Sequence, residues 1–221
     1  MKPSSLVLLI VVLPTGTALA LAPMGQPTSS LKEGQMSAGV SYMNGDEDIH
    51  FVGGPAKGID LESVLVTVAL GIREDQMDVF LRGGVGTRSC PLMDTDAPAA
   101  GAGTRITLTG NETLSWGLLA QFVWYGFESG TVESDLYDIQ IATGPSWHVM
   151  DNLMVYGGPF VHLIDGTQDM KGIGVFDLEQ ESALGGYVGT GLEIGTHLTV
   201  ASEFQFTPNA SGFAVTANWR F

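Results

Sequence analysis

The sequence predicts an all-β fold, an antiparallel up-and-down transmembrane β-barrel of ten strands. Three observations carry this prediction. Beyond residue 34 the apolar residues recur with a period of two, which is the period of a strand. The connections between these runs alternate between long and short, and the last run ends on an aromatic residue, Phe221. Eight strands are the alternative, if the first run at 35–42 or the short run at 103–109 is not a strand.

Composition already excludes several classes of protein. The chain has 221 residues, 30 glycines, one cysteine and 44 % apolar residues, and its net charge is −15. That charge argues against a nucleic-acid partner, whose phosphates would be repelled. A single cysteine excludes an intramolecular disulfide and a Cys-rich zinc site. The apolar content is too high for a disordered acidic chain.

The N-terminus reads as a cleavable signal peptide over 1–20. Lys2 provides the positive start, residues 6–13 form the apolar run, and Ala18-Leu19-Ala20 is the cleavage pattern, with Ala22 ending a second candidate. Eight apolar residues are too few for a membrane-spanning helix, which needs about 20. Residues 21–34, rich in Pro, Gly, Thr and Ser, are expected to be a flexible periplasmic lead-in to a barrel over 35–221.

Ten runs alternate large apolar residues with small or polar ones. In the last run, Phe213, Val215 and Trp219 share one face, whereas Thr216 and Asn218 share the other. The run at 103–109 alternates in the same way. The predicted strands are 35–42, 62–72, 78–86, 103–109, 114–127, 135–149, 152–164, 181–194, 197–206 and 212–221.

The connections set the orientation of the predicted barrel. Long connections over 43–61, 87–102 and 165–180 alternate with tight turns such as 110–113 and 150–151. Long loops on one rim and tight turns on the other are the arrangement of a bacterial outer-membrane barrel. We therefore expect both barrel termini in the periplasm and the long loops outside the cell.

Aromatic residues are placed as expected for a membrane barrel. Trp116 and Trp124 lie eight residues apart on one face of a single run, which is on the order of 20 Å of height in a tilted strand. Lys and Arg are nearly absent from the predicted lipid face, where they would be costly. The predicted girdle at the two membrane interfaces consists of Tyr42, Trp116, Trp124, Tyr137, Trp147, Trp219 and Phe221.

The closing residues 213–221 (FAVTANWRF) resemble the C-terminal signature of outer-membrane barrels. The general resemblance is to small bacterial outer-membrane β-barrel proteins of the OmpA/OmpX/OmpW-like superfamily, with no subfamily signature. In that family the terminal aromatic lies in the segment read by the insertion machinery, which implies Trp219 and Phe221 as the insertion signal. Such a protein would have outer-membrane lipid, lipopolysaccharide, periplasmic chaperones and the barrel-insertion machinery as partners.

Polar residues on the inward face are the candidate site. Period-two counting places a set of charges and amides in the lumen, and in a narrow barrel such groups need partners or water. A packed polar lumen with acidic extracellular loops predicts an envelope-structural or surface-interaction role. A narrow channel or small-solute transport barrel is the alternative. The predicted lumen network is Arg82, Arg105, Gln121, Glu193, Glu203, Gln205 and Arg220.

Catalysis is not predicted. An omptin-like outer-membrane protease is similar in having ten strands with acids and a histidine at the extracellular rim, and here 46–50 and 162–165 could approach that rim. The paired aspartates of that family are not reproduced in order or spacing, and nothing marks an acyl-transfer site. The acidic loops match no EF-hand. We therefore expect no enzyme, no cofactor and no metal site, and the sequence names no extracellular ligand.

Overall fold

The structure is a computed structural model. It describes residues 21–51, 57–73, 76–90, 93–130, 132–172, 174–180, 184–208 and 210–221. The predicted signal peptide over 1–20 lies outside the described residues. Among the described residues, no helix has the length and apolar character needed to cross a membrane.

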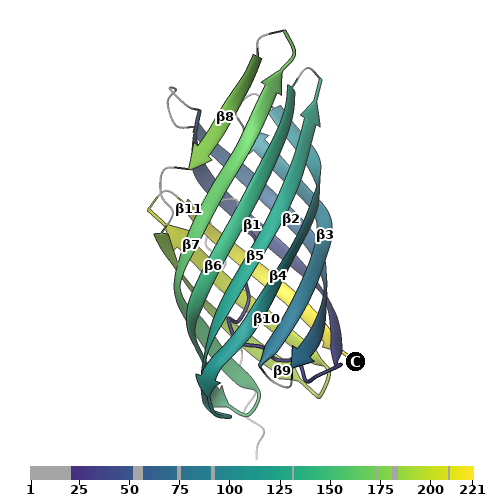
Figure 1. The fold of residues 1–221 in the computed structure, drawn as a ribbon, viewed down its shortest axis with the longest axis vertical. Helices are drawn as coiled ribbons and strands as arrows, with labels where there is room; N and C mark the ends of the chain where they lie inside the picture. Colours follow the sequence, from purple (N-terminus) through teal and green to yellow (C-terminus); the bar gives the residue numbers. More distant parts are fainter. Residues whose placement is uncertain are drawn as a thin grey trace, which may run out of the picture.

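The chain forms one antiparallel sheet that closes on itself (Figure 1). Its strands are β1 (Met36–Phe51), β2 (Lys57–Arg73), β3 (Met77–Cys90), β4 (Met93–Gly110), β5 (Leu114–Ser129), β6 (Val132–Met150), β7 (Leu153–Met170), β8 (Gly174–Gln180), β9 (Leu184–Ile194), β10 (Leu198–Thr207) and β11 (Ala210–Arg220). Neighbouring strands pair in order, and β1 closes the barrel against β11 in a continuous register from Ser37↔Arg220 to Glu47↔Ala210.

Ten of these strands form the barrel wall, and the prediction of ten is confirmed. The remaining strand, β8, is a short extension at one end. It pairs with the end of β7, from Asp165↔Glu179 to Met170↔Gly174, and with the end of β1 around His50↔Glu179. Farther down the barrel, β9 takes its place beside β7. The strand β8 therefore raises the wall at one end without adding to its circumference.

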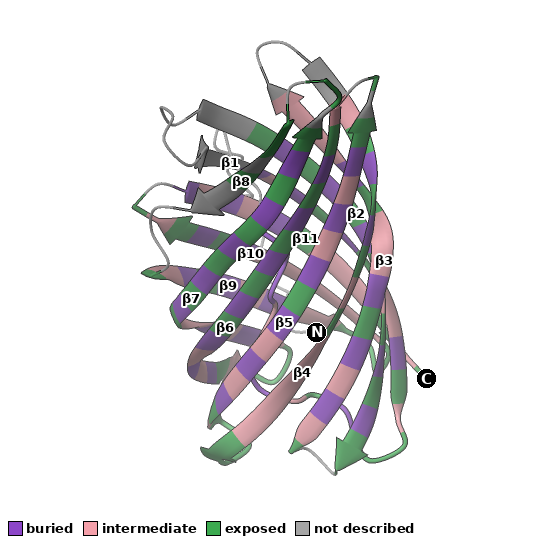
Figure 2. Cartoon of the chain, turned by 45° about the horizontal axis from the view of Figure 1, so that its top comes forward, coloured by how far each residue is buried: buried purple, intermediate pink, exposed green. Residues whose placement is uncertain are grey.

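Alternating burial shows which face of each strand points inward. Along β6, buried residues alternate with exposed ones from Glu133 to Ala142. Figure 2 shows the same stripes along β5, β6 and β7. Inward side chains are shielded by the opposite wall, so a period of two in the sequence becomes two faces of a closed sheet.

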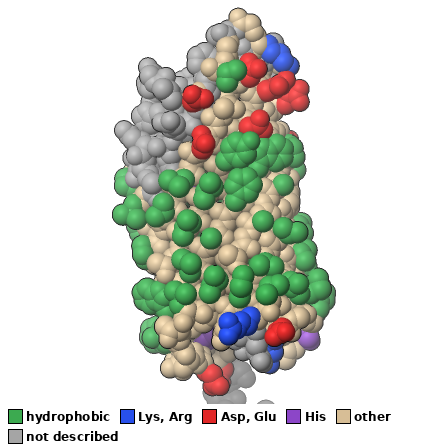
Figure 3. All heavy atoms as spheres, viewed as in Figure 1, with side chains coloured by type: hydrophobic (Ala, Val, Ile, Leu, Met, Phe, Trp, Pro, Cys, Tyr) green, Lys and Arg blue, Asp and Glu red, His purple; other side chains and the backbone are tan. Residues whose placement is uncertain are grey.

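The outer surface carries an apolar belt (Figure 3). Exposed Val, Leu, Ile and Phe side chains such as Val66, Ile141 and Phe204 cover the wall. Acidic side chains gather beyond one edge of this belt. We call that end of the barrel the acidic end and the opposite end, where Gln35 and Phe221 lie, the terminal end. The acidic end carries the exposed residues Asp60, Asp96, Glu128, Glu133, Asp135, Asp165, Asp169 and Asp177.

The predicted girdle residues all lie on the outer face. Trp116 and Trp124 donate indole N–H bonds to Thr143 Oγ1 and Asp135 Oδ1, both at 2.9 Å. The remaining members, Tyr42, Tyr137, Trp147, Trp219 and Phe221, are exposed large side chains.

The long loops are the main difference from the sequence prediction. Most of 43–61, 87–102 and 165–180 is paired strand, and β3 and β4 are separated by two residues only. The acidic residues Asp165 and Asp169 therefore stand on the wall of β7 and not on a loop. The side chains of 46–50 lie outside the described residues.

Candidate functional site

The lumen divides into two halves of different chemistry. The terminal half is lined by charged, amide and hydroxyl side chains, among them Arg82, Arg105, Glu203 and Arg220. The acidic half is lined mostly by apolar side chains. A ring of amides and acids separates the two, since Gln121 pairs in register with Gln140, and Gln140 with His162.

Residues 21–32 fill part of the terminal half, and we call them the lumenal segment. This differs from the sequence prediction of a flexible periplasmic lead-in. Leu21, Ala22 and Met24 are buried, with Ala22 0 % exposed. The segment has no regular secondary structure of its own, so its backbone polar groups must find partners on the wall.

The ring of amides and acids holds the peptide group of Ala22. Its N–H donates to Asp138 Oδ2 at 3.1 Å. Its carbonyl accepts from Gln121 Nε2 at 3.3 Å and from Gln205 Nε2 at 3.0 Å. The amides of Gln121 and Gln140 meet at 2.6 Å. Three separate strands, β5, β6 and β10, thus converge on one residue of the segment.

Glu203 binds the next residues of the segment, Met24 and Gly25. Its carboxylate accepts from the backbone N–H of Met24 at 3.0 Å and of Gly25 at 2.8 Å, and from Gln205 Nε2 at 2.6 Å. Such charge-assisted bonds to N–H groups are stronger than neutral ones. The intervening carbonyl, that of Pro23, accepts from Arg82 Nη1 at 2.8 Å.

The segment is anchored further along its length toward the terminal end. Thr28 Oγ1 donates to Ser146 Oγ at 2.9 Å. Gly117 of β5 allows this close approach, because a Cβ there would lie 2.4 Å from the carbonyl oxygen of Pro27. Leu31 is buried with Ala69 and Phe80 against the wall.

The predicted lumen residues lie inside the barrel but do not form one network. Arg105 Nε donates to Asp78 Oδ1 at 2.8 Å, and Arg220 Nη2 to Glu193 Oε1 at 2.7 Å. These two ion pairs join neighbouring or near-neighbouring strands. The other predicted members, Gln121, Glu203, Gln205 and Arg82, contact the lumenal segment instead.

Sequence reasoning missed the pair formed by Asp138 and His162. Their side chains meet at 3.0 Å, from Oδ1 to Nε2, and both are buried in the lumen. The sequence prediction had placed His162 near the extracellular rim, which the structure corrects. Period-two counting from Gln140 also reaches Asp138, so this inward acid could have been found.

The acidic half is built on aromatic and aliphatic contacts. Tyr125 and Phe127 stack at 6.2 Å between ring centroids; next to the ring of amides and acids, Phe160 meets Tyr187 edge-on at 6.2 Å. Arg88 lies 5.7 Å from the centre of the Phe127 ring. Buried aliphatic side chains complete this lining, namely Met43, Leu61, Ala97, Ala99, Leu136 and Ile164.

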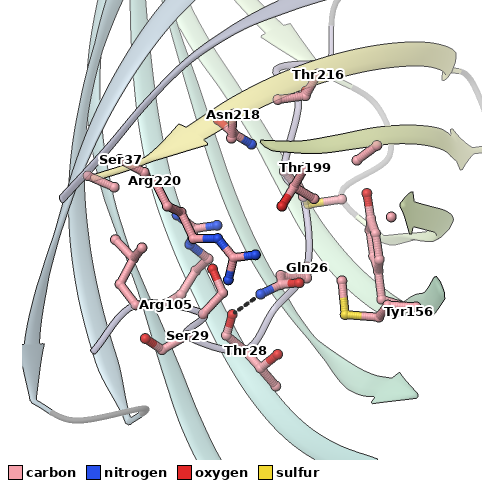
Figure 4. Close-up of a pocket in the computed structure, with 18 of the residues that line it drawn as sticks. Gln26, Thr28, Ser29, Ser37, Arg105, Tyr156, Thr199, Thr216, Asn218 and Arg220 are labelled. Atoms are coloured by element: carbon pink, nitrogen blue, oxygen red, sulfur yellow. Dashed lines mark hydrogen bonds between the residues drawn. The ribbon is translucent and has the colours of Figure 1, made fainter. Parts of the chain in front are cut away.

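A cavity of about 240 Å³ remains in the terminal half, between the lumenal segment and the wall. Figure 4 shows Arg105 and Arg220 reaching into this space from the wall, with Gln26, Thr28 and Ser29 of the segment facing them. Its lining also includes Ser37, Tyr156, Thr199, Thr216 and Asn218. Nearly all of these side chains offer hydrogen-bond donors.

Metal binding has no support in the part of the chain that the structure describes, where no three His, Cys, Asp or Glu side chains are grouped to hold an ion. The contacts that the lumen does show are hydrogen bonds from its walls to the backbone of the lumenal segment.

No protein-family model and no curated protein matches this chain. Solved structures do match it. Ail, the attachment invasion locus protein of Yersinia pestis, is 11 % identical over 86 % of this chain and 99 % of Ail, with a TM-score of 0.45. An outer-membrane channel from Pseudomonas putida F1 is 11 % identical over 91 % of this chain and 100 % of the channel, with a TM-score of 0.48.

The outer membrane protease OmpT from Escherichia coli is 9 % identical over 91 % of this chain and 99 % of OmpT, with a TM-score of 0.46. At these identities the likeness concerns the fold and not the function. The ten-strand closure and the apolar belt are those of a small outer-membrane β-barrel of the Gram-negative type.

Proposed function

We propose that this protein is a non-conducting outer-membrane barrel, closed by its own lumenal segment, with a structural or surface-interaction role in the envelope. The observation that carries the proposal is the seating of residues 21–32 in the lumen. Carboxylates, amides and a guanidinium from the wall bind consecutive peptide groups between Ala22 and Gly25. An ion crossing the barrel would meet this segment, which occupies much of the lumen beside the ring of amides and acids.

The acidic half supports the same proposal for a different reason. A lumen lined by side chains such as Phe127, Leu136 and Ile164 offers an ion little to replace its water. Hydrophobic constrictions of this kind gate channels by dewetting. The two halves therefore oppose conduction independently, one by occupation and the other by desolvation. This favours the non-conducting barrel over the narrow channel.

The proposal also includes an orientation of the barrel in the membrane and a class of partners. The terminal end would face the periplasm and the acidic end the exterior, where the carboxylates of Glu133, Asp135 and Asp169 would meet lipopolysaccharide and other cell-surface partners. We propose no catalytic role, because the buried pair Asp138–His162 is engaged beside the segment.

Planar-bilayer recording of the purified mature protein tests the proposal. We expect no steady unitary conductance. A steady conductance whose ion preference changes in Glu203→Gln would contradict the non-conducting barrel and support the narrow channel, because Glu203 would then line water and not the segment. Matched folding of both proteins, checked by heat-modifiable gel migration, makes the comparison valid.

The insertion signal needs a separate test. Trp219 and Phe221 are exposed on the outer face at the terminal end, where the insertion machinery could read them. Deleting Phe221 should lower the outer-membrane level of the protein while secretion continues, as measured by cell fractionation. Normal outer-membrane levels of the deletion variant would remove this role.

A further inference from the structure

We propose that the cavity in the terminal half is a binding site for a small oxyanion carrying a phosphate or carboxylate group. This proposal is independent of whether the barrel conducts. The cavity is lined by the lumenal segment and by inward residues of all ten wall strands. A solute of the size of phosphate, with a few waters, fits the volume of about 240 Å³.

The charge of the lining is the first argument. Three guanidinium groups line the cavity, those of Arg82, Arg105 and Arg220, whereas Glu193 is the one carboxylate among the described lining residues. Asp78, which pairs with Arg105, and Glu203, which binds the backbone of the segment, are not among the lining residues, so the charged groups that face the cavity are mainly positive. A ligand in this space would meet guanidinium groups first, and such groups bind anions through charge-assisted hydrogen bonds.

Arg82 provides the second argument, because it is 9 % exposed and forms no ion pair within the described residues. Its one hydrogen bond goes to a neutral carbonyl, that of Pro23, and its Nε has no acceptor among the described groups. Arg82 and Arg105 both lie against the ring of Phe80, at 4.7 and 5.2 Å from its centre. Both guanidinium groups also line the cavity, and positive groups attract an anion there.

The neutral part of the lining is the third argument. Serine, threonine, asparagine and glutamine side chains surround the guanidinium groups, and Figure 4 shows them facing one shared space. Guanidinium groups bind phosphate and carboxylate in a two-pronged geometry, and hydroxyl or amide N–H groups complete the shell. These neutral donors are Gln26, Ser29, Ser37, Thr199, Thr216 and Asn218.

The lumenal segment forms one wall of this site, since Gln26, Thr28 and Ser29 belong to it. The site is thus complete only when the segment is seated. It lies near the terminal end, among residues such as Ser37 and Arg220 at the strand ends, so the solute would enter from that end.

Calorimetric titration of the refolded full-length mature barrel with inorganic phosphate at low ionic strength tests the proposal. We expect saturable binding at one site per chain. In the double variant Glu193→Gln/Arg220→Gln, which removes one ion pair without leaving a lone charge, binding should weaken by about tenfold or more. Lys171→Gln, at the acidic end, is the matched control and should bind as the parent protein does.

A second double variant, Asp78→Asn/Arg105→Gln, guards against a folding defect caused by changing the last strand. It should also weaken phosphate binding, and gel migration checks that each variant is folded. Titration with acetate in a parallel arm distinguishes carboxylate from phosphate ligands. Absence of saturable binding of both anions, or equal affinity in the parent and in both folded double variants, would overturn the proposal.

Discussion

The two halves of the lumen differ in how their inward side chains are satisfied. At the ring and in the terminal half below it, Asp138 and Glu203 are buried acids whose partners include N–H groups of Ala22, Met24 and Gly25. In the acidic half, side chains such as Phe127 are buried against other apolar groups. The same ten strands thus enclose two kinds of interior.

This difference teaches what a barrel must supply for each kind of interior. Apolar side chains need only contact with one another, which the narrow wall provides. Buried carboxylates need donors, and a strand presents its own N–H groups to its neighbours and not to the lumen. Here the chain provides the missing donors by returning 21–32 into the barrel.

The largest effect is expected from Asp138→Leu. This change removes the acceptor of the Ala22 N–H and the partner of His162, and each buried donor left without an acceptor costs about 1–3 kcal/mol. The free energy of unfolding should fall by about 2–6 kcal/mol. The lumenal segment should also become sensitive to added protease, measured by the mass of the digested protein.

Leu136→Ala is the matched control in the acidic half, two residues away on the same strand. It creates a cavity in an apolar interior and should cost about 2–5 kcal/mol. Leu136 belongs to the same apolar cluster as Leu21 of the segment, but the segment should stay protected because the change leaves its hydrogen bonds to Asp138 and Glu203 in place. Equal protease sensitivity of the two variants would mean that the halves are not distinct.

The sequence predicted the wall well because each strand carries its own evidence. Alternation in β10 and β11 is visible from neighbouring residues, and hydrogen bonds to adjacent strands then fix the closure. It failed at the ends of strands such as 93–102, where Ala, Gly, Pro and Asp read as a loop. Pairing with β3 makes this stretch a strand, and pairing partners are not written in local composition.

The lumenal segment was missed for a related reason. Its composition is that of a linker, and its partners lie far away in the chain, with Met24 bound to Glu203. The period-two pattern identified Glu203 as an inward residue, but it gave no indication of the backbone N–H groups that bind its carboxylate. The available signals were the inward glycine at 117, which leaves space beside the wall, and the inward acids without a cation opposite them.

A smaller effect is expected from Gly117→Ala, which changes only the fit of the segment. The added methyl would collide with the carbonyl of Pro27 at 2.4 Å, so the segment must shift. We expect a loss of about 1–3 kcal/mol in the free energy of unfolding. Partial protease sensitivity of 21–32 should accompany it.

Gly83→Ala serves as the control for the general effect of alanine in a strand. A Cβ at Gly83 meets nothing closer than 3.6 Å. That variant should keep the parent stability and a protected segment. If both alanine variants behave alike, the close approach at Gly117 does not matter to the seating of the segment.

The N-terminal residue of the mature chain gives a further test. Cleavage after Ala20 keeps Leu21 and Ala22 in the lumen, whereas cleavage after Ala22 would remove the peptide group bound by Asp138, Gln121 and Gln205. We expect the intact mass to show a chain that begins at Leu21. A chain shortened to begin at Pro23 should lose about 1–2 kcal/mol of stability. A natural start at Pro23 would contradict the role of Ala22.

The smallest effect concerns the exposed pair Lys171–Glu133 at the acidic end, with 2.6 Å between Nζ and Oε1. If burial is what makes the polar contacts of the terminal half stabilising, this exposed pair should add no measurable stability, because water screens it. The Glu133 carboxylate raises the pKa of Lys171 above 10.5, through a hydrogen bond and through charge attraction.

A raised lysine pKa stabilises the folded state below the unfolded pKa, and this contribution disappears as the pH rises through the folded value. The difference between the parent protein and Glu133→Gln should therefore be flat between about pH 6 and 9. An NMR titration of the Lys171 side chain should show its pKa falling toward the ordinary value in Glu133→Gln. A large stability loss in that variant at neutral pH would show that exposed pairs at the acidic end matter as much as the buried polar contacts of the terminal half.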